Sequence, residues 1–170
     1  MKATVGRLIV IGYGNMGKAL VQGVTTPPPG GGGEPDAHLL YTPDRIVAVD
    51  THGSPGGPVV RRVGSIGLVG PLSEHDEVVL AVKPQVYPEV APALAAALPE
   101  ASLMVLSVMA GIPTRRLALD LGMRGRAVRA MPNTPAQVGQ GATAYAPGPY
   151  ATDADAERAE VFLKRLGPLV

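Results

Sequence analysis

The sequence has no cysteine, no tryptophan and a single phenylalanine among its 170 residues. Without cysteine the chain can form neither a disulfide nor a thiolate metal site. Its three histidines, His38, His52 and His75, lie far apart and lack the spacing of metal ligands, so we expect no metal. Because aromatic residues are so few, the core must be mostly aliphatic.

The sequence also lacks a charge imbalance and a long apolar run. Fifteen basic residues face fourteen acidic ones, which gives a net charge of +1 and no electrostatic case for a nucleic-acid or acidic-membrane partner. The first apolar stretch, residues 8–11, is too short for a signal-peptide core or a membrane span. We therefore expect a cytoplasmic protein.

Apolar, β-branched runs alternate with helical stretches along most of the chain. Strands are expected at residues 7–11, 45–49, 77–82, 102–108, 126–130 and 142–145, and helices at 18–24, 86–98, 113–121 and from 152 to about 166. This alternation predicts an α/β fold of the Rossmann-like, doubly wound type, with a mostly parallel sheet and helices on both faces.

Two stretches fit this pattern poorly. Residues 25–37 are rich in proline and glycine and read as a surface insertion within one dinucleotide-binding domain that spans residues 1–170. Between residues 51 and 70 the prolines and glycines leave only residues 59–63 as a crossover helix, and residues 65–69 as a further strand.

A G-x-G-x-x-G pattern stands between the first expected strand and the first expected helix. Gly12 permits the tight turn, Gly14 has no Cβ to block a pyrophosphate, and Gly17 lets the helix pack closely. The helix amino terminus offers free N–H groups and a favourable dipole to an anion. The pattern therefore predicts binding of a dinucleotide pyrophosphate, with a glycine-rich turn that has no ligand as the alternative.

Asp50 ends the second expected strand, where a carboxylate can accept hydrogen bonds from the adenosine ribose. It would repel a 2′-phosphate, and no basic residue follows at once, although Arg61 and Arg62 could reach the site. The residue chemistry therefore favours NAD over NADP, and a strand-end Asp that only caps its loop is the alternative.

Three further loops follow strands at the edge where such sheets bind ligands. Lys83 is followed by Pro84, which turns the chain sharply away from the sheet. Small residues at 107–111 would allow a flat ring to approach. Two prolines fix the backbone around Asn133 and Thr134, which suits the orientation of a small polar substrate. Plain turns are the alternative at each loop.

Taken together, these stretches resemble pyrroline-5-carboxylate reductase, an enzyme family of proline biosynthesis. The resemblance rests on residues 11–20, 81–84, 107–112 and 129–141, the last of which reads RAMPNTPAQVGQG. It implies an oxidoreductase of CH–NH donors that uses NADP or NAD to reduce 1-pyrroline-5-carboxylate to L-proline.

The resemblance also implies roles for individual residues. The expected cofactor contacts are Ile11, Gly12, Tyr13, Gly14, Asn15, Met16, Gly17, Asp50, Ala81, Val82, Lys83, Pro84, Val108, Met109 and Ala110. Asn133 and Thr134 are the expected substrate-binding residues, near the nicotinamide. No catalytic acid is assigned to this chain.

Three departures from the family pattern affect this interpretation. Asp50 argues against tight binding of a 2′-phosphate, although family members usually use NADPH well. The family commonly has an Asn before the fourth strand, where this chain has residues 67–72 without one. The family also continues into a helical dimerisation domain, which we expect this chain to lack, so we expect the chain alone to reduce the imine slowly or not at all.

Two other functions remain open. One is a nucleotide-binding or regulatory module without catalysis. The other is a related reductase, such as a deazaflavin-linked NADP reductase or a 3-hydroxy acid dehydrogenase, which the loop at residues 131–135 disfavours.

Overall fold

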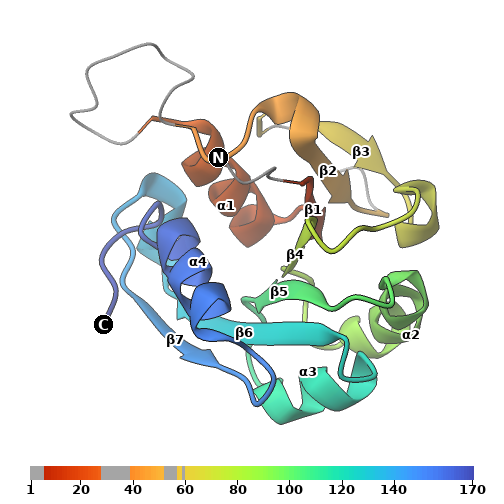
Figure 1. The fold of residues 1–170 in the computed structure, drawn as a ribbon. Coiled ribbons are helices and arrows are strands. Elements are labelled where there is room, and N and C mark those ends of the chain that lie inside the picture. The colour runs from red at the N-terminus through yellow and green to blue at the C-terminus, as the bar shows by residue number, and fades with distance from the viewer. Residues whose placement is uncertain (1–5, 28–38, 52–56, 59) are drawn as a thin grey trace, which may run out of the picture.

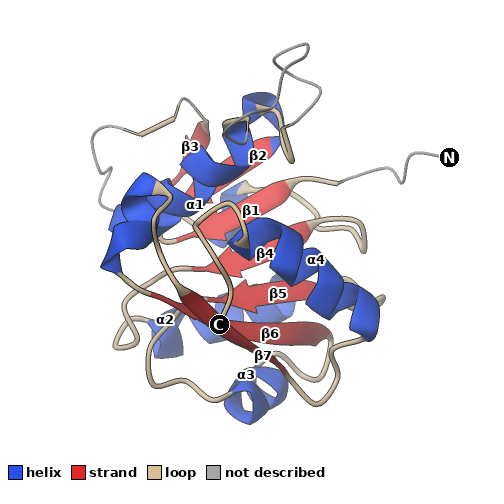
Figure 2. Ribbon diagram, turned by 90° about the vertical axis from the view of Figure 1, so that its left-hand side faces the viewer, coloured by secondary structure: helices blue, strands red, loops and turns tan. Residues whose placement is uncertain are grey.

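A computed structural model describes residues 6–27, 39–51, 57–58 and 60–170 of the chain. In this part seven strands form one sheet in the order β3-β2-β1-β4-β5-β6-β7 (Figures 1 and 2). The strands are β1 (Leu8–Ile11), β2 (Ile46–Val49), β3 (Arg61–Val63), β4 (Glu77–Leu80), β5 (Leu103–Ser107), β6 (Gly125–Pro132) and β7 (Thr143–Pro147). The predicted α/β fold class is confirmed. Most of the proline- and glycine-rich insertion lies outside the described residues.

The pairing of the strands brings their carboxyl ends to one edge of the sheet. β1 pairs in parallel with β2 and β4, with Ile11 beside Val49 and Leu80, and β4 pairs in parallel with β5. Only the β6–β7 pair is antiparallel in the described sheet. The four residues of β1 are all buried, which is why this strand reads as a continuous apolar run.

Helices cover both faces of the sheet. They are α1 (Asn15–Thr25), α2 (Tyr87–Ala97), α3 (Thr114–Asp120) and α4 (Asp153–Leu163), and short 3₁₀ helices occur at η2 (Pro43–Arg45), η3 (Ile66–Leu68) and η4 (Thr134–Val138). α1 and α4 lie on one face and α2 and α3 on the other (Figures 1 and 2). No described helix is long and apolar enough to cross a bilayer.

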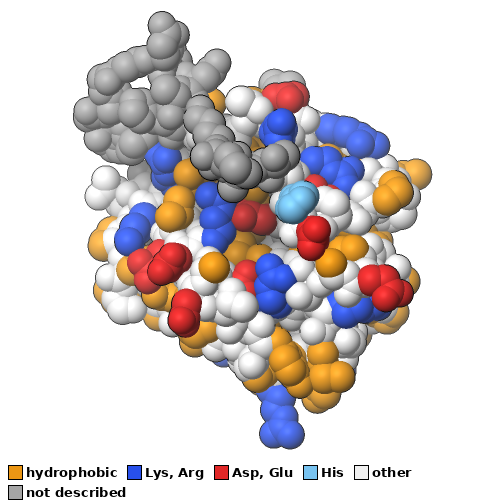
Figure 3. Space-filling model, in the orientation of Figure 1, with side chains coloured by type: hydrophobic (Ala, Val, Ile, Leu, Met, Phe, Trp, Pro, Cys, Tyr) orange, Lys and Arg blue, Asp and Glu red, His pale blue; other side chains and the backbone are white. Residues whose placement is uncertain are grey.

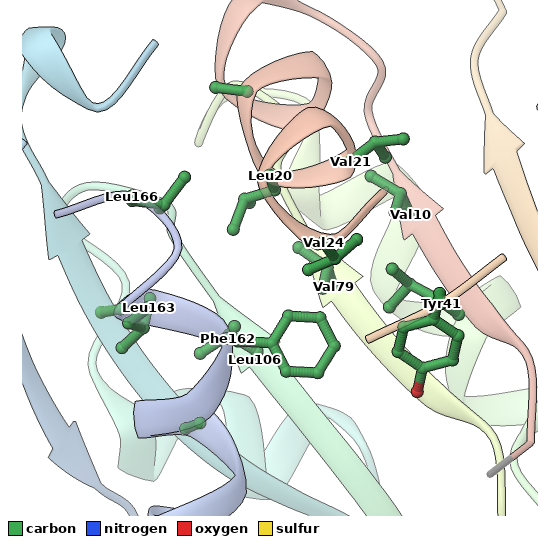
Figure 4. Packing of buried hydrophobic residues seen from close by; sticks show 14 of the residues in the cluster. Val10, Leu20, Val21, Val24, Tyr41, Val79, Leu106, Phe162, Leu163 and Leu166 are labelled. Carbon is green, nitrogen blue, oxygen red and sulfur yellow. The ribbon is translucent and has the colours of Figure 1, made fainter. Parts of the chain in front are cut away.

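Each face has its own aliphatic core. On the first face Leu20 and Val24 of α1 meet Phe162 of α4 above Val79 and Leu106 of the sheet (Figure 4). On the second face Leu94 of α2 and Leu117 of α3 pack on the sheet. The single phenylalanine is fully buried, at 0% exposure. The two cores hold the strand ends, and hence the loops after them, in fixed positions.

The structure corrects the expectation for residues 51–70. Arg61–Val63 is the edge strand β3 and not a crossover helix, because it pairs in parallel with β2. The Val63 carbonyl also accepts a hydrogen bond from the Asp50 amide at 2.9 Å. The predicted strand at residues 65–69 is instead η3, in which Leu68 and Val69 donate to residues three positions earlier. Exposed, short and basic, β3 lacks the apolar pattern that the other strands show.

The first helix begins earlier than predicted. We expected it from residue 18, but α1 starts at Asn15 because the Lys18 amide already donates to the Gly14 carbonyl at 2.9 Å. The glycine motif therefore overlaps the first turn of the helix, since Gly17 lies inside it. This overlap places the amide groups of the first turn at the carboxyl edge of the sheet.

Candidate functional site

The three glycines of the motif have different structural reasons to lack a side chain. Gly12 has a φ of +96°, and a Cβ there would lie 2.6 Å from the Ala81 carbonyl carbon. A Cβ at Gly17 would lie 2.1 Å from the Gly12 oxygen. A Cβ at Gly14 would meet nothing within 4 Å. Gly12 and Gly17 thus allow close packing, whereas Gly14 faces open space that a ligand can occupy.

The amino terminus of α1 points its donors at this space. The amides of residues 15–17 precede the first intrahelical hydrogen bond, which leaves them without partners inside the helix. No side chain caps this end, and the first turn carries no acidic residue. The helix end therefore presents an uncompensated positive dipole, which suits an anion such as a pyrophosphate.

A cleft of about 450 Å³ opens beside the glycine turn, between the carboxyl ends of β1, β2 and β4. Its lining consists of Ile11, Gly12, Tyr13, Gly14, Val49, Asp50, Thr51, Ala81, Val82, Lys83, Val86 and Val90. A cleft at this edge is where an open parallel sheet binds its ligands. Its volume is in the range of ordinary ligand pockets.

The lining contains eight of the residues predicted to contact a cofactor, from Ile11–Gly14, Asp50 and Ala81–Lys83. Seven others lie outside the lining: Asn15, Met16, Gly17, Pro84, Val108, Met109 and Ala110. Residues 15–17 belong to the adjoining helix end, and Met109 is buried, at 1% exposure. The prediction missed Val49, Thr51, Val86 and Val90. The last two are four residues apart, a spacing that places both on one face of a helix.

Asp50 lies half-buried at the end of β2, where its backbone amide donates a hydrogen bond to the Val63 carbonyl. Of the two nearby arginines, Arg61 turns away and donates to the Leu68 carbonyl at 2.9 Å. Arg62 lies on the other side of the strand, with its guanidinium 4.8 Å from the centre of the Tyr13 ring. Arg62 is thus a basic residue beside Tyr13 at this part of the site.

The Tyr13 side chain is part of the packing of the site and does not project from it. The ring is fully buried, and its hydroxyl donates to the Pro58 carbonyl at 3.1 Å. Burial raises the pKa of the Tyr13 phenol, and the neighbouring Arg62 offsets part of this rise. The phenol is therefore neutral at physiological pH and adds no negative charge where an anion would bind.

Inter-strand hydrogen bonds fix the loops after β4 and β5. The Ala81 amide donates to the Ile11 carbonyl at 2.8 Å, and the Val108 amide donates to the Leu80 carbonyl at 3.0 Å. These bonds continue the parallel ladder by one residue beyond each strand. The turn residues at 81–83 are thereby held beside the glycine turn.

Asn133 and Thr134 follow β6 at the same edge of the sheet but do not line the cleft. Asn133 is exposed, and its side-chain oxygen accepts a hydrogen bond from the Ala142 amide at 3.0 Å. Thr134 begins the 3₁₀ helix η4, which lies beside α1 (Figure 1). The predicted substrate loop thus packs against α1, the helix that begins within the glycine motif.

Comparison with known proteins identifies relatives of the whole described fold. The chain is 34% identical to a pyrroline-5-carboxylate reductase from Escherichia coli strain K12. The match extends over 148 residues and covers 85% of this chain and 51% of that protein. A reductase of the same name from Methanosarcina acetivorans is 32% identical over 94% of this chain and 56% of its own length. This chain is similar to the pyrroline-5-carboxylate reductases. The resemblance predicted from the motifs is confirmed.

Solved structures agree with this similarity. A pyrroline-5-carboxylate reductase from Coxiella burnetii superposes with a TM-score of 0.78 at 25% identity, over 98% of this chain and 58% of that one. One from Plasmodium falciparum, with NADP bound, shares the fold with a TM-score of 0.75 at 21% identity, over 96% of this chain and 56% of that one. No family model matches the sequence. The chain spans about half the length of the curated relatives it matches.

Proposed function

We propose that this chain is the dinucleotide-binding part of a pyrroline-5-carboxylate reductase and binds NADH or NADPH in the cleft at the carboxyl edge of its sheet. The observation that carries the proposal is the open space at Gly14 in front of the uncapped end of α1. Relatives named as this reductase, one of them solved with NADP bound, support the choice of cofactor.

The residues of the cleft suit the parts of such a cofactor. The amides of Asn15–Gly17 would hold the pyrophosphate, with Gly14 leaving room for it. Asp50 would accept hydrogen bonds from the adenosine ribose. Ala81, Val82 and Lys83 would contact the cofactor between its pyrophosphate and its nicotinamide. The loop residues 108–110 would contact it nearer the nicotinamide.

When bound, the cofactor supplies a hydride, which in this family reduces the cyclic imine 1-pyrroline-5-carboxylate to L-proline. The role of this chain is to hold the dinucleotide in one orientation, so that the reactive ring faces the substrate. Asn133 and Thr134 are proposed to lie beside that substrate, at the edge beyond β6. We assign no proton donor to this chain.

The carboxylate of Asp50 favours NADH over NADPH, because it would repel a 2′-phosphate. In binding NADPH, Arg62 would contact the 2′-phosphate, since its guanidinium lies beside Tyr13 on the same side of the site. We propose that both cofactors bind and that NADH binds more tightly. We place the reaction in the cytoplasm and the family's dimerisation in a helical domain outside this sequence.

The binding proposal is tested by calorimetric titration of the folded chain with NADH and with NADPH. In the variant Gly14→Val the Cβ would meet no protein atom within 4 Å and the side chain would enter the space of the pyrophosphate, so binding should be lost while the chain stays folded. The matched control is Gly67→Val in η3, where only Ser65 Oγ lies near, at 3.9 Å. Equal binding by Gly14→Val and wild type would contradict the proposal.

A second candidate function is a nucleotide-binding module without catalysis, which the helix-end donors and the cleft at the sheet edge support equally well. Turnover of pyrroline-5-carboxylate by this chain alone, with either cofactor, would eliminate it. If the chain binds cofactor but turns over only when a helical reductase domain is supplied, it acts as the cofactor half of the enzyme.

A further inference from the structure

The loop that follows β6 is closed by a set of backbone contacts from distant parts of the chain. Asn133 Oδ1 accepts the Ala142 amide at 3.0 Å, which ties the start of the loop to its end. The Gly141 amide donates to the Leu166 carbonyl at 2.8 Å, and the Thr143 amide donates to the Pro168 carbonyl at 3.1 Å. The segment after α4 therefore fixes the loop from its far side.

Two glycines allow this segment to approach the loop. Gly167 has a φ of +135°, and a Cβ there would lie 1.8 Å from the Gly141 oxygen. A Cβ at Gly141 would lie 2.7 Å from the Cα of Ala136, a buried residue of η4 that shares the core with α1. Side chains at Gly141 and Gly167 would force the loop and the last segment apart.

This closure determines what Asn133 can offer a ligand. An amide N–H can bond only to an acceptor, so the Asn133 atom facing Ala142 must be the carbonyl oxygen. The NH₂ group is then the other end of the amide, and Asn133 is exposed at the ligand edge. The hydrogen bond from Ala142 thus fixes the orientation of the Asn133 amide: Oδ1 faces the loop, and the NH₂ group is the part that can donate to a ligand.

Resting on the proposed function, we propose that the Asn133 NH₂ donates to the carboxamide oxygen of the nicotinamide, and that the Gly141–Gly167 crossing positions it for this contact. A dinucleotide spans such a sheet, with its adenosine over β2 and its other half over the strands on the far side of β1. Asp50 marks the adenosine end, and β6 with Asn133 lies on the opposite side of β1. The η4 helix beside α1 keeps Asn133 on the same rigid body as the pyrophosphate donors.

The variant Asn133→Asp separates the two roles of this side chain. Its carboxylate still accepts the Ala142 amide, so the loop stays closed, but it has no N–H to give the ligand. We expect affinity for NADH to fall about fivefold or more, while affinity for ADP-ribose, which lacks the nicotinamide, is unchanged. Hydrogen exchange of the Ala142 amide in the free protein should match that of the wild type.

The variant Gly167→Ala tests the positioning role. Its Cβ would collide with the Gly141 carbonyl, so we expect faster exchange at Ala142, weaker NADH binding and unchanged ADP-ribose binding. The control is Gly139→Ala in the same loop, which shares a positive φ, at +71°, but meets nothing within 4 Å.

Each outcome bears on a different claim. If Asn133→Asp binds NADH as tightly as wild type, or loses NADH and ADP-ribose equally, the donor role is overturned. If Gly167→Ala leaves Ala142 exchange unchanged, the positioning role is overturned. If the wild-type chain binds neither NADH nor ADP-ribose, the proposed function itself has failed.

Discussion

The glycines of the candidate site differ in their surroundings: some allow close backbone packing, and one borders open space. Gly17 lies in the first turn of α1, directly against the Gly12 carbonyl, whereas Gly14 borders open space. A sequence motif shows all three glycines alike. Only the surroundings of each Cβ position show which glycine the fold requires and which one a ligand requires.

The substitution Gly17→Ala should destabilise the protein, because the added Cβ would lie 2.1 Å from a backbone oxygen that cannot rotate away. We expect a loss of about 1–3 kcal/mol in the free energy of unfolding. The matched control is Gly14→Ala, whose Cβ meets nothing within 4 Å and should leave stability unchanged. Urea denaturation of both variants measures the difference, and equal stabilities would show that the close packing at Gly17 is not required.

The substitution Asp50→Asn should shift cofactor preference toward NADPH. Removing the carboxylate removes its repulsion of a 2′-phosphate, for which we expect a change of about five- to tenfold in the ratio of the two dissociation constants. Asp44→Asn in the exposed η2, before β2 instead of after it, is the control. Titration with each cofactor reports the ratio, and a preference that Asp50→Asn leaves unaltered would remove Asp50 from the ribose site.

Elements whose role is encoded in local pattern could be predicted from the sequence. The buried strands of the sheet centre were found because both of their faces are apolar, as in β1 and β5. The edge strand β3 was not found, since Arg61 and Arg62 are exposed and its identity depends on pairing with β2. The antiparallel partner of β6 was expected as a strand, but its direction follows only from the tertiary fold.

The candidate site shows the same division. The glycine turn and the loop after β4 were predicted to bind a cofactor, and the structure brings them together around one cleft. Residues 108–110 were predicted to contact the cofactor because they follow a strand. Their place in the sequence does not reveal that Met109 is buried in the core. The bond between Asn133 and Ala142 spans nine residues and leaves no trace in local spacing.

Asp155, in the first turn of α4, makes the free energy of unfolding depend on pH. Its capping box joins Thr152 and Asp155, and Arg126 donates to the Asp155 carboxylate at 2.9 Å. Burial alone would raise the pKa of Asp155, but the hydrogen bonds from Arg126 and Thr152 outweigh it and hold this pKa below its usual value. The unfolded chain therefore takes up the proton first, and the stabilisation present above the ordinary carboxyl pKa of about 4 is lost as pH falls through the folded value.

We accordingly expect Asp155→Asn to be less stable than wild type at pH 7, by about 1–2 kcal/mol. The difference should shrink as the pH falls below about 4, because the unfolded wild-type chain takes up its proton there and the folded carboxylate follows at lower pH. Urea denaturation at a series of pH values measures this. Asp153→Asn, in the same first helical turn, is the control. A gap that stays constant down to pH 3 would show that the Asp155 charge is not the source of the stability.

Two ion pairs of the molecule lie at the edge of the sheet opposite the cleft. Both lie where strands begin: Arg7, before β1, pairs with Asp76, before β4, and Arg158 of α4 pairs with Glu77 at the start of β4. The cleft lies at the opposite ends of the same strands. On the face that carries α1 and α4, basic and acidic side chains are interspersed and not gathered into one patch (Figure 3). The binding site can therefore carry unpaired helix-end donors without weakening the ionic contacts of the fold.

The central claim is that a dinucleotide binds at the carboxyl edge of the sheet, with its pyrophosphate at the start of α1. The most direct test is an NMR titration of the isotopically labelled chain with NADH, which follows each backbone amide. We predict saturable shifts at Gly14–Gly17, Asp50 and Ala81–Lys83, and none around Glu74–Glu77 at the opposite edge. Shifts confined to the opposite edge, or no saturable shifts in a folded chain, would contradict the account.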